Sequence, residues 1–469
     1  MRKTIITMTF AGIAAFSASA LNISLTPGEM QKHFADISNT SDEQLVLSGT
    51  ADVRDLALLR QLSPSVKTVD MSQLDIAAYT YPEGNYMGLT SFAANELPAY
   101  VMAGSDITSV KLPVSCSVIG RSAFMGSQLQ SIDIPASVTR IADYAFSNAN
   151  SLKTASCSGD VAFGVGVFKD CVALTDVTVS PSIRDIPASM FDGCVLLACE
   201  IPESVTKIGD FAYRATALTE VNLSNVTEVG SYSFADMKKL QSIIINENRK
   251  LKMGAAAFFN SGELSEFPQF TTDLSNAAFA HSASNVKNLT VHSATIGVGA
   301  YANNACLDTI TLGPAVRSVG AHAFRNAGAL TMVDACSLGT NIPEVDAESF
   351  SGLLNDEGRY GIKLNVEDGT QQQWEEHPVW GLFEVGHYKT GVEDVVADGV
   401  VISARRDGRD IIVTSTDNID YIGVFSVNGT VLHEAVPSSM EYTVSDIDNS
   451  GVVVIKVISG GISKIVKLM

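Results

Sequence analysis

The sequence predicts a β-rich solenoid, and two observations carry that prediction. Similar segments recur about every 22 residues through the middle of the chain, as in residues 129–146, 196–213 and 307–324. Each segment also has the same internal pattern. A strand-like run has apolar residues at its first, fourth and sixth places, and a turn and an Ala–aromatic pair follow it. Twelve units aligned at this period are the pattern of a repeat architecture.

The aromatic position sets the register of the repeats, with neighbouring anchors 21 to 26 residues apart. The twelve anchors are Met102, Phe124, Phe146, Phe168, Phe191, Tyr213, Phe234, Phe258, Phe279, Tyr301, Phe324 and Phe350. Four large buried side chains contribute roughly 6–12 kcal/mol, whereas ordering about 22 residues costs on the order of 20–40 kcal/mol. Single units therefore need stacked neighbours, and we expect a parallel sheet with strands about 4.8 Å apart.

Strand side chains alternate between two faces. The fourth and sixth places are expected to face the core with the leading Leu and the anchor, and the third and fifth places to face solvent. Glycines at the following corner are expected to allow a tight turn. They are Gly120, Gly209, Gly230 and Gly320.

Residues 21–98 are predicted to cap the first coil. Within them, 45–49 and 66–72 have strand patterns and 53–62 has helical spacing. A long aromatic segment, 73–98, follows. It is expected either to cover the open end of the core or to form a lip that contacts a ligand. Its aromatic residues are Tyr79, Tyr81, Tyr86 and Phe92.

Here the residues carry a family resemblance. The unit L-x-S-I-x-I-P-x-S-V-x-x-I-G-x-x-A-F resembles the BspA-type leucine-rich repeat of bacterial surface proteins, and it extends over residues 99–352. The resemblance implies a leucine-rich repeat superhelix of about twelve units. Residues 362–385 resemble the family's C-terminal cap, although 366–369 depart from its VPxGS phrase. We therefore expect a C-terminal cap at 353–390, in which Trp374, Trp380 and Phe383 close the core.

One repeat departs from the pattern. The segment LSEFPQF at 264–270 places Pro268 and Gln269 at the fifth and sixth places of its strand. Proline cannot donate to a strand ladder. We therefore expect a local irregularity near residues 259–272.

The end of the chain changes character. Residues 391–398 are predicted to be a linker, and 399–469 to form a small antiparallel β-sandwich of short strands. Those strands are VVISAR, DIIVTS, YIGVFSV, TVLHEA, YTVSDI, VVVIKV and ISKIVKL, with hairpin turns expected at Asn428-Gly429 and Gly460-Gly461. The phrases FSVNGTVL, GVVVIKV and the basic KIVKLM resemble the C-terminal sorting domain of type IX secretion cargo. Val453 stands where that family usually has Tyr, and the alternative is a sandwich that merely ends the protein.

Charge and targeting patterns narrow the function classes. Residues 1–20 have a basic start, a short apolar run and the small-residue site Ala18-Ser19-Ala20, as in a secretory signal peptide. No other run is long enough to span a bilayer. The net charge is −20 and the isoelectric point about 4.7, which disfavours nucleic acid and anionic membranes as partners.

No pattern predicts a catalytic residue, a cofactor or a metal site. The seven His residues are scattered, and HExxH, GxSxG and P-loop patterns are missing from the sequence. Carboxylates on neighbouring coils remain an open alternative for a hydrolase. The seven Cys residues lack metal-ligand spacing, so they are expected to be buried thiols, with one or two disulfides between coils as the alternative.

The outward places of the strands are the candidate protein-binding face. Their residues are small and polar, with one Lys against six acids and no aromatic side chain. Stacking on sugars usually needs aromatic faces, so the face suits a basic or hydroxyl-rich protein. A face that only keeps the sheet soluble is the alternative. The candidate residues are Lys111, Asp133, Asp176, Thr178, Glu200, Glu220, Asn222, Asn288, Thr290, Thr309 and Thr311.

The leading hypothesis is therefore a non-enzymatic, exported or surface-attached protein. The family resemblance implies adhesion to surface or matrix proteins of a host or of neighbouring cells. Two alternatives are an envelope scaffold without a dedicated ligand and a glycan-binding protein.

Overall fold

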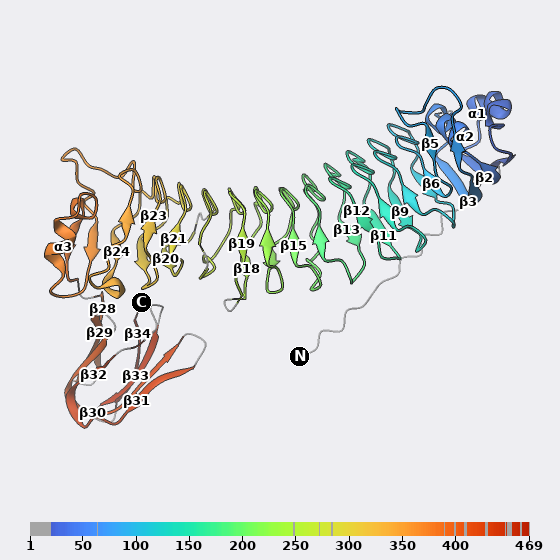
Figure 1. Ribbon diagram of the computed structural model, residues 1–469. Helices are drawn as coiled ribbons and strands as arrows, with labels where there is room; N and C mark the ends of the chain where they lie inside the picture. Colours follow the sequence, from blue (N-terminus) through green and yellow to red (C-terminus); the bar gives the residue numbers. More distant parts are fainter. Residues whose placement is uncertain are drawn as a thin grey trace. The chain divides into compact units, whose positions relative to one another are not determined.

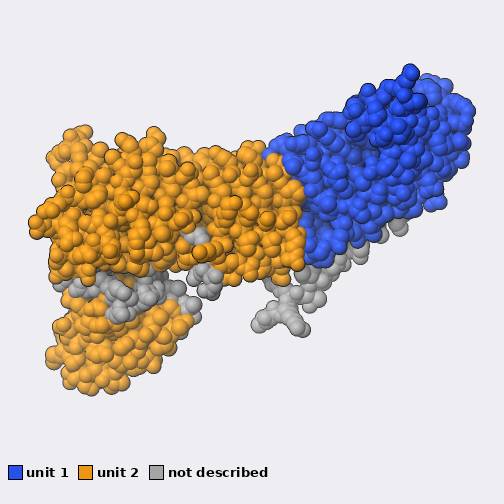
Figure 2. All heavy atoms as spheres, viewed as in Figure 1, with its two compact units in different colours: residues 1–183, 190–199 blue, residues 184–189, 200–469 orange. Residues whose placement is uncertain are grey.

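The computed structural model describes most of the chain (Figure 1). The described residues are 20–62, 64–246, 249–271, 273–282, 285–388, 390–397, 400–407, 410–426, 430–445, 447, 453–459 and 462–468. The predicted signal peptide lies outside them except for Ala20. The chain divides into two compact units, residues 1–183 with 190–199 and residues 184–189 with 200–469 (Figure 2).

The N-terminal segment of the first unit builds a four-stranded parallel sheet in the order β1-β2-β3-β7. Its strands are β1 (Ala20–Leu25), β2 (Gln44–Ala51), β3 (Thr68–Ile76) and β7 (Ser109–Lys111). The helices are η1 (Met30–His33), α1 (Phe34–Asn39), α2 (Val53–Leu56) and η2 (Ala57–Gln61). The two predicted strands and the predicted helical segment are confirmed as β2, β3 and α2–η2. Strand β1 was not predicted.

The buried carboxylates of Asp52 and Asp55 connect parts of this N-terminal segment through hydrogen bonds. Asp52 and Asp55 form a capping box at the start of α2. Asp55 also accepts backbone N–H bonds from Gly28 at 2.7 Å and Met30 at 2.9 Å. Removing either carboxylate would leave buried N–H groups without a partner.

The aromatic lip, defined as residues 73–98, is not a plain loop. It contains β4 (Tyr79–Thr80) and β5 (Ser91–Phe92), which pair antiparallel, and β6 (Glu96–Leu97). Tyr81 packs edge-on against Tyr79 and Phe92, with ring centroids 5.0 and 6.3 Å apart. The lip is thus a small hairpin held by its own aromatic contacts.

Most repeats contribute a strand to a first face and a two-residue strand to a second face, and the second-face strands were not predicted. In the first unit the first-face strands are β9 (Ser131–Ile134), β11 (Thr154–Cys157) and β13 (Asp176–Thr178). The second-face strands are β6, β8 (Val118–Ile119), β10 (Arg140–Ile141) and β12 (Ala162–Phe163). All of them pair in parallel.

The second unit repeats this arrangement. Its first face has two sheets, β16 (Glu220–Asn222) with β18 (Ser242–Ile244), and β20 (Asn288–Val291), β22 (Thr309–Leu312), β24 (Met332–Asp334), β26 (Lys363–Asn365) and β27 (Glu384–Gly386). Its second face has β14 (Asp185–Ile186), β15 (Lys207–Ile208), β17 (Glu228–Val229) and β19 (Lys252–Met253), and then β21 (Thr295–Ile296), β23 (Ser318–Val319) and β25 (Glu344–Val345). A short 3-10 turn, η3 (Cys336–Leu338), follows β24.

The anchor residues form the core, as predicted, and all twelve are buried. In the first unit the rings of Phe124 to Phe191 stack with centroids 5.3–5.9 Å apart. In the second unit Tyr213 to Phe350 stack at 5.1–5.9 Å. The fold class read from the sequence, a parallel solenoid of many turns, is confirmed.

The residue three places after the anchor adds a polar ladder beside the rings. Cys171 donates its thiol hydrogen to the carbonyl of Phe146, and Cys194 donates to Phe168, both at 3.0 Å. Asn304 makes the same contact with Phe279 at 2.9 Å. These side chains satisfy carbonyls that lie inside the solenoid.

The cysteines are all free thiols. Cys116, Cys157, Cys171 and Cys194 are buried, as expected for small hydrophobic residues. Cys306 is exposed, so the expectation was wrong there.

The corner glycines have a different purpose from the one predicted. None of the four has a positive φ. A Cβ on Gly120 would lie 2.4 Å from the carbonyl oxygen of Leu97, and one on Gly230 would lie 2.4 Å from the nitrogen of Asp210. Their role is close stacking of coils. The left-handed conformation occurs two residues before and after the anchor, as at Tyr144 and Asn148 around Phe146.

First-face pairing is interrupted between β7 and β9 and again in two segments that lack a strand, so the predicted continuous sheet of twelve strands is wrong in this respect. The expected irregularity near 259–272 is confirmed, because 265–270 lack strand structure. The other segment without a strand, 198–201, was not predicted. There Leu197 is fully buried while Leu196, the expected leading Leu, is 51% exposed. Only five steps separate Leu197 from Pro202, against six from Leu129 to Pro135, so the strand is one residue short.

The C-terminal cap closes the core as predicted. It contains α3 (Gln371–Glu375) and η4 (Trp380–Leu382). Trp374, Trp380 and Phe383 are fully buried. The ring of Phe350, the last anchor, meets Trp380 at 5.7 Å and Phe383 at 5.0 Å.

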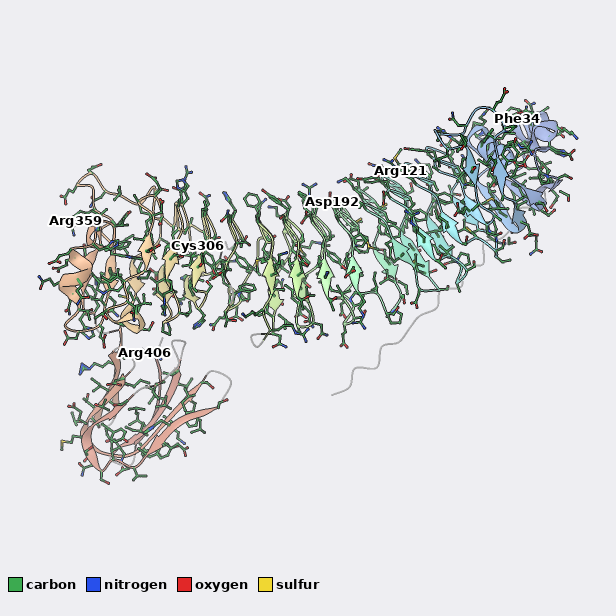
Figure 3. The ribbon with its side chains drawn as sticks, in the orientation of Figure 1. Phe34, Arg121, Asp192, Cys306, Arg359 and Arg406 are labelled. Atoms are coloured by element: carbon green, nitrogen blue, oxygen red, sulfur yellow. The ribbon has the colours of Figure 1, made fainter. Side chains whose placement is uncertain are left out.

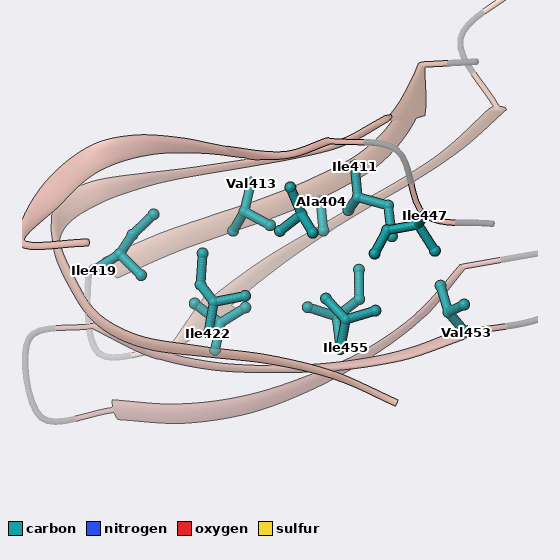
Figure 4. Close-up of a cluster of buried hydrophobic side chains, with 11 residues drawn as sticks. Ala404, Ile411, Val413, Ile419, Ile422, Ile447, Val453 and Ile455 are labelled. Carbon is teal, nitrogen blue, oxygen red and sulfur yellow. The ribbon is translucent and has the colours of Figure 1, made fainter. Parts of the chain in front are cut away.

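The end of the chain forms an antiparallel sheet of seven strands. They are β28 (Thr390–Ala397), β29 (Val400–Asp407), β30 (Asp410–Ser426), β31 (Val431–Ala435), β32 (Ser439–Val444), β33 (Val453–Ser459) and β34 (Ile462–Leu468). Strand β30 pairs with β29 and β32 through its first half and with β31 and β33 through its second. The sheet therefore folds over one apolar core, with strands on both sides of the buried cluster (Figure 4).

Two predictions for this region need correction. The segments DIIVTS and YIGVFSV belong to one long strand, β30, whose pairing with β32 shifts register between Thr414 and Ile419. The predicted linker at 391–398 largely forms β28, which pairs with β29. The predicted turns at 428–429 and 460–461 lie outside the described residues.

Candidate protein-binding face

The first-face strands present their third and fifth places to solvent, as the alternation predicts. In β9, Ser131 and Asp133 are exposed while Ile132 and Ile134 are buried. In β13, Asp176 and Thr178 are exposed on either side of buried Val177. The strand geometry thus separates the core from the surface residues.

Ten of the eleven candidate residues lie on first-face strands. They are Lys111 on β7, Asp133 on β9, Asp176 and Thr178 on β13, Glu220 and Asn222 on β16, Asn288 and Thr290 on β20, and Thr309 and Thr311 on β22. Glu200 is the exception. It lies in the interrupted segment at 198–201, outside any strand, because the strand there is one residue short.

In the first unit the pairing register aligns the candidates in rows. Ser131, Thr154 and Asp176 form one row, and Asp133, Ser156 and Thr178 the next. Within the second row the Ser156 hydroxyl donates to Asp133 at 2.6 Å. This patch therefore combines hydroxyl groups with the carboxylates of Asp133 and Asp176.

Lys111 does not add a free positive charge to the face. Its ammonium lies 2.7 Å from a carboxylate oxygen of Asp70 on β3, and the backbone register pairs the two residues. Burial opposes ionisation of Asp70, but hydrogen bonds from Lys111 and Ser72 lower its pKa below the ordinary value. Asp70 was missed in the sequence. The strand phase of residues 66–72, in which Asp70 occupies the fifth place, would have found it.

The second unit presents two separate patches. On β16 and β18, Glu220 accepts a hydrogen bond from Ser242 at 3.2 Å, and Asn222 pairs in register with Ile244. On the larger sheet, one row runs Asn288, Thr309, Met332, Lys363 and Glu384. These rows mix amides, hydroxyls and charges of both signs, so they are less acidic than the first-unit patch.

The described residues contain no group of His, Cys, Asp and Glu side chains placed to hold a metal ion. No helix in the described part of the chain is long and apolar enough to cross a membrane. The chemistry available on the candidate face is hydrogen bonding and charge attraction.

Comparison with known proteins assigns the repeats. The model of the BspA type leucine rich repeat region matches in six copies, over residues 95–213, 161–284 and 252–355, which together span more than half of the chain. No curated protein matches the chain.

Two solved structures illustrate the likeness. A leucine-rich repeat protein from Bacteroides ovatus is 20% identical, with a TM-score of 0.54, covering 79% of this chain and 92% of its own. A leucine rich cell surface protein from Faecalibacterium prausnitzii is 18% identical, with a TM-score of 0.37, covering 65% and 83%. The first has the same fold. With its repeats matched over more than half of its length, the chain belongs to the BspA type leucine rich repeat family.

Proposed function

We propose that this protein is exported to the cell surface and binds basic or hydroxyl-rich proteins of a host or of neighbouring cells through its first-face strands. The observation that supports this most is the patch on β9, β11 and β13. It exposes two carboxylates and a set of hydroxyls, while Lys111, the one basic residue among the candidates, is already paired with Asp70.

The binding would rest on many small contributions. A typical net hydrogen bond contributes about 0.5–1.5 kcal/mol, and an exposed ion pair about 0–1 kcal/mol. Repeated rows on a stacked solenoid offer many such contacts at fixed spacing. In this proposal the solenoid binds without catalysing a reaction.

The test is capture of extracellular-matrix or salivary proteins on the immobilised mature chain. The variant D133K/D176K should lose the captured protein, because two attractive charges become repulsive. The matched variant Asp185→Lys changes an exposed acid on the second face and should retain it. Equal capture by all three proteins would contradict the proposed face. Signal on a glycan array without protein capture would favour the glycan-binding alternative, and no capture at all would favour the scaffold.

Export and sorting form a second part of the proposal. We propose the division 1–20 signal peptide, 21–98 N-terminal cap, 99–352 solenoid, 353–390 C-terminal cap and 399–469 sorting domain, to whose sheet β28 (Thr390–Ala397) also belongs. The support is the basic and apolar leader, and the type IX resemblance of the terminal phrases. Deleting 399–469 should leave the protein inside the cell envelope. Surface display that is unchanged by the deletion, measured by protease accessibility on whole cells, would contradict the sorting role.

A further inference from the structure

An open groove of about 1020 Å³ lies in the first unit, away from the first-face strands. Drug-sized ligand sites are typically about 300–1,000 Å³, so the groove can hold several residues of an extended peptide. Its lining residues are Arg60, Met87, Leu89, Ala99, Tyr100, Ala103, Gly104, Arg121, Met125, Gly126 and Asn148. They come from η2, from the lip and from the corners of the first coils.

The lip supplies an apolar wall that is held in position. Met87 and Leu89 are 50% and 54% exposed, which is high for large apolar side chains. They belong to a tight turn in which Tyr86 and Leu89 exchange backbone hydrogen bonds. The Tyr86 hydroxyl donates to the carbonyl of Ala99 at 2.9 Å and so ties this turn to the first coil. Burial raises the pKa of Tyr86, which keeps the hydroxyl protonated.

The charge of the groove is opposite to that of the protein. Arg60 and Arg121 are exposed, and no Asp or Glu lines the groove. Neither arginine forms an ion pair within the described part of the chain. Arg121 is labelled in Figure 3. In a chain of net charge −20, such a site attracts carboxylates, while positively charged ligands are favoured elsewhere.

The floor allows a peptide backbone to approach closely. It contains Ala103, Gly104 and Gly126, and a Cβ added to either glycine would meet no atom within 4 Å. Met87 and Met125 provide flexible, polarisable side chains that adapt to different apolar partners.

We propose that this groove binds an extended acidic peptide segment of a partner protein, in which carboxylates alternate with aliphatic side chains. The carboxylates would bind Arg60 and Arg121, and the aliphatic side chains would pack against Met87, Leu89 and Met125. This site is separate from the first-face binding proposed above and does not depend on it.

The probe is a fluorescein-labelled hexapeptide in which leucine alternates with glutamate, titrated against the mature chain in an anisotropy assay. A matched hexapeptide carries glutamine in place of glutamate. The glutamate peptide should bind at least about fivefold more tightly, and salt should weaken it, because the added attraction is electrostatic. Arg121→Glu should weaken it at least about tenfold and Leu89→Ser at least about fivefold. Arg140→Glu, an exposed arginine on β10 outside the groove, should change binding by less than about twofold.

Four outcomes would overturn the proposal. Equal binding of the two peptides would show that the carboxylates are not required. Equal losses for Arg121→Glu and Arg140→Glu would show that the groove is not the binding site. Loss of peptide binding in D133K/D176K would move the site to the first face. Self-association of the chain that Arg121→Glu abolishes, measured by sedimentation, would identify a second copy as the occupant instead. Thermal midpoints within about 2 °C of the parent chain show that each surface variant remains folded.

Discussion

The segments at 198–201 and 265–270 both lack a first-face strand, but for different reasons. In the segment at 265–270 the strand keeps its six places from Leu264, but Pro268 and Gln269 occupy the fifth and sixth of them. In the segment at 198–201 the residue types suit a strand, but the spacing from Leu197 to Pro202 is one residue short. A first-face strand in this solenoid therefore requires both suitable residue types and the regular number of residues from the leading Leu to the end of the strand.

The two segments also fill the core differently. Phe267 and Phe270 are buried in the second, and Phe267 packs edge-on against Phe279 at 5.3 Å and Tyr301 at 5.0 Å. The anchors on either side, Phe258 and Phe279, still stack at 5.2 Å. Extra aromatic volume thus replaces the missing inward aliphatic residues. In the first segment, the fully buried Leu197 takes the inward position instead.

The largest effect is expected in a regular coil. Phe146→Ala removes a fully buried ring that stacks on Phe124 and Phe168, and should lower the free energy of unfolding by about 3–5 kcal/mol. Chemical denaturation followed by circular dichroism measures the loss. Tyr232→Ala, at a 40% exposed ring, is the control and should cost less than about 1 kcal/mol. Similar losses at both positions would show that the anchor ladder is not the main source of stability.

A smaller loss is expected in the segment with altered chemistry. Phe267→Ala should cost about 2–4 kcal/mol, because it leaves a cavity beside Phe279 and Tyr301. Phe267→Leu restores an aliphatic residue at the fourth place and should cost less than about 1.5 kcal/mol. If the alanine variant is as stable as the leucine variant, the ring does not compensate for the missing strand.

The short segment can be repaired by insertion. One serine added between Ala198 and Cys199 gives the sequence L-A-S-C-E-I-P, which restores six steps from Leu197 to Pro202. We expect new ladder hydrogen bonds, slower amide exchange at 199–201 and a gain of about 0.5–1.5 kcal/mol. The same insertion after Gln130, in a regular coil, should be destabilising. Unchanged exchange at 199–201 would show that spacing is not the cause of the interruption.

The last prediction compares the alkylation rates of cysteine thiols in a regular coil and in the interrupted segment. Burial raises the pKa of both Cys171 and Cys199 to about 12, so both stay protonated at pH 8. Cys171 is fully buried in the polar ladder, whereas Cys199 is partly exposed in the interrupted segment. Pulsed alkylation with mass spectrometry should label exposed Cys306 first, then Cys199, then Cys171, with at least about tenfold between the extremes. Equal rates in the folded protein would contradict this order, and equal rates in guanidinium are the control.

The sequence alone determined the repeats, because their contacts are periodic. The anchor aromatics, the inward aliphatics and the outward polar places follow from a period of about 22 residues and from strand alternation. The sequence also predicted that Trp374, Trp380 and Phe383 close the core, because these aromatic residues come after the last repeat. The irregularity near 264–270 was predictable as well, since proline has a fixed effect on a ladder.

Only the tertiary structure decided the features that depend on contacts between coils. The one-residue deficit near Leu197 is invisible to a pattern of residue types and appears when neighbouring strands must align. At the four corner glycines an added Cβ would collide with backbone of the preceding coil. A single repeat does not contain that neighbouring backbone. The lip meets the corner at Ala99 through the Tyr86 hydroxyl, a contact that periodicity does not predict. Local patterns fix what each coil looks like, whereas close packing between coils fixes where strands, pairs and grooves form.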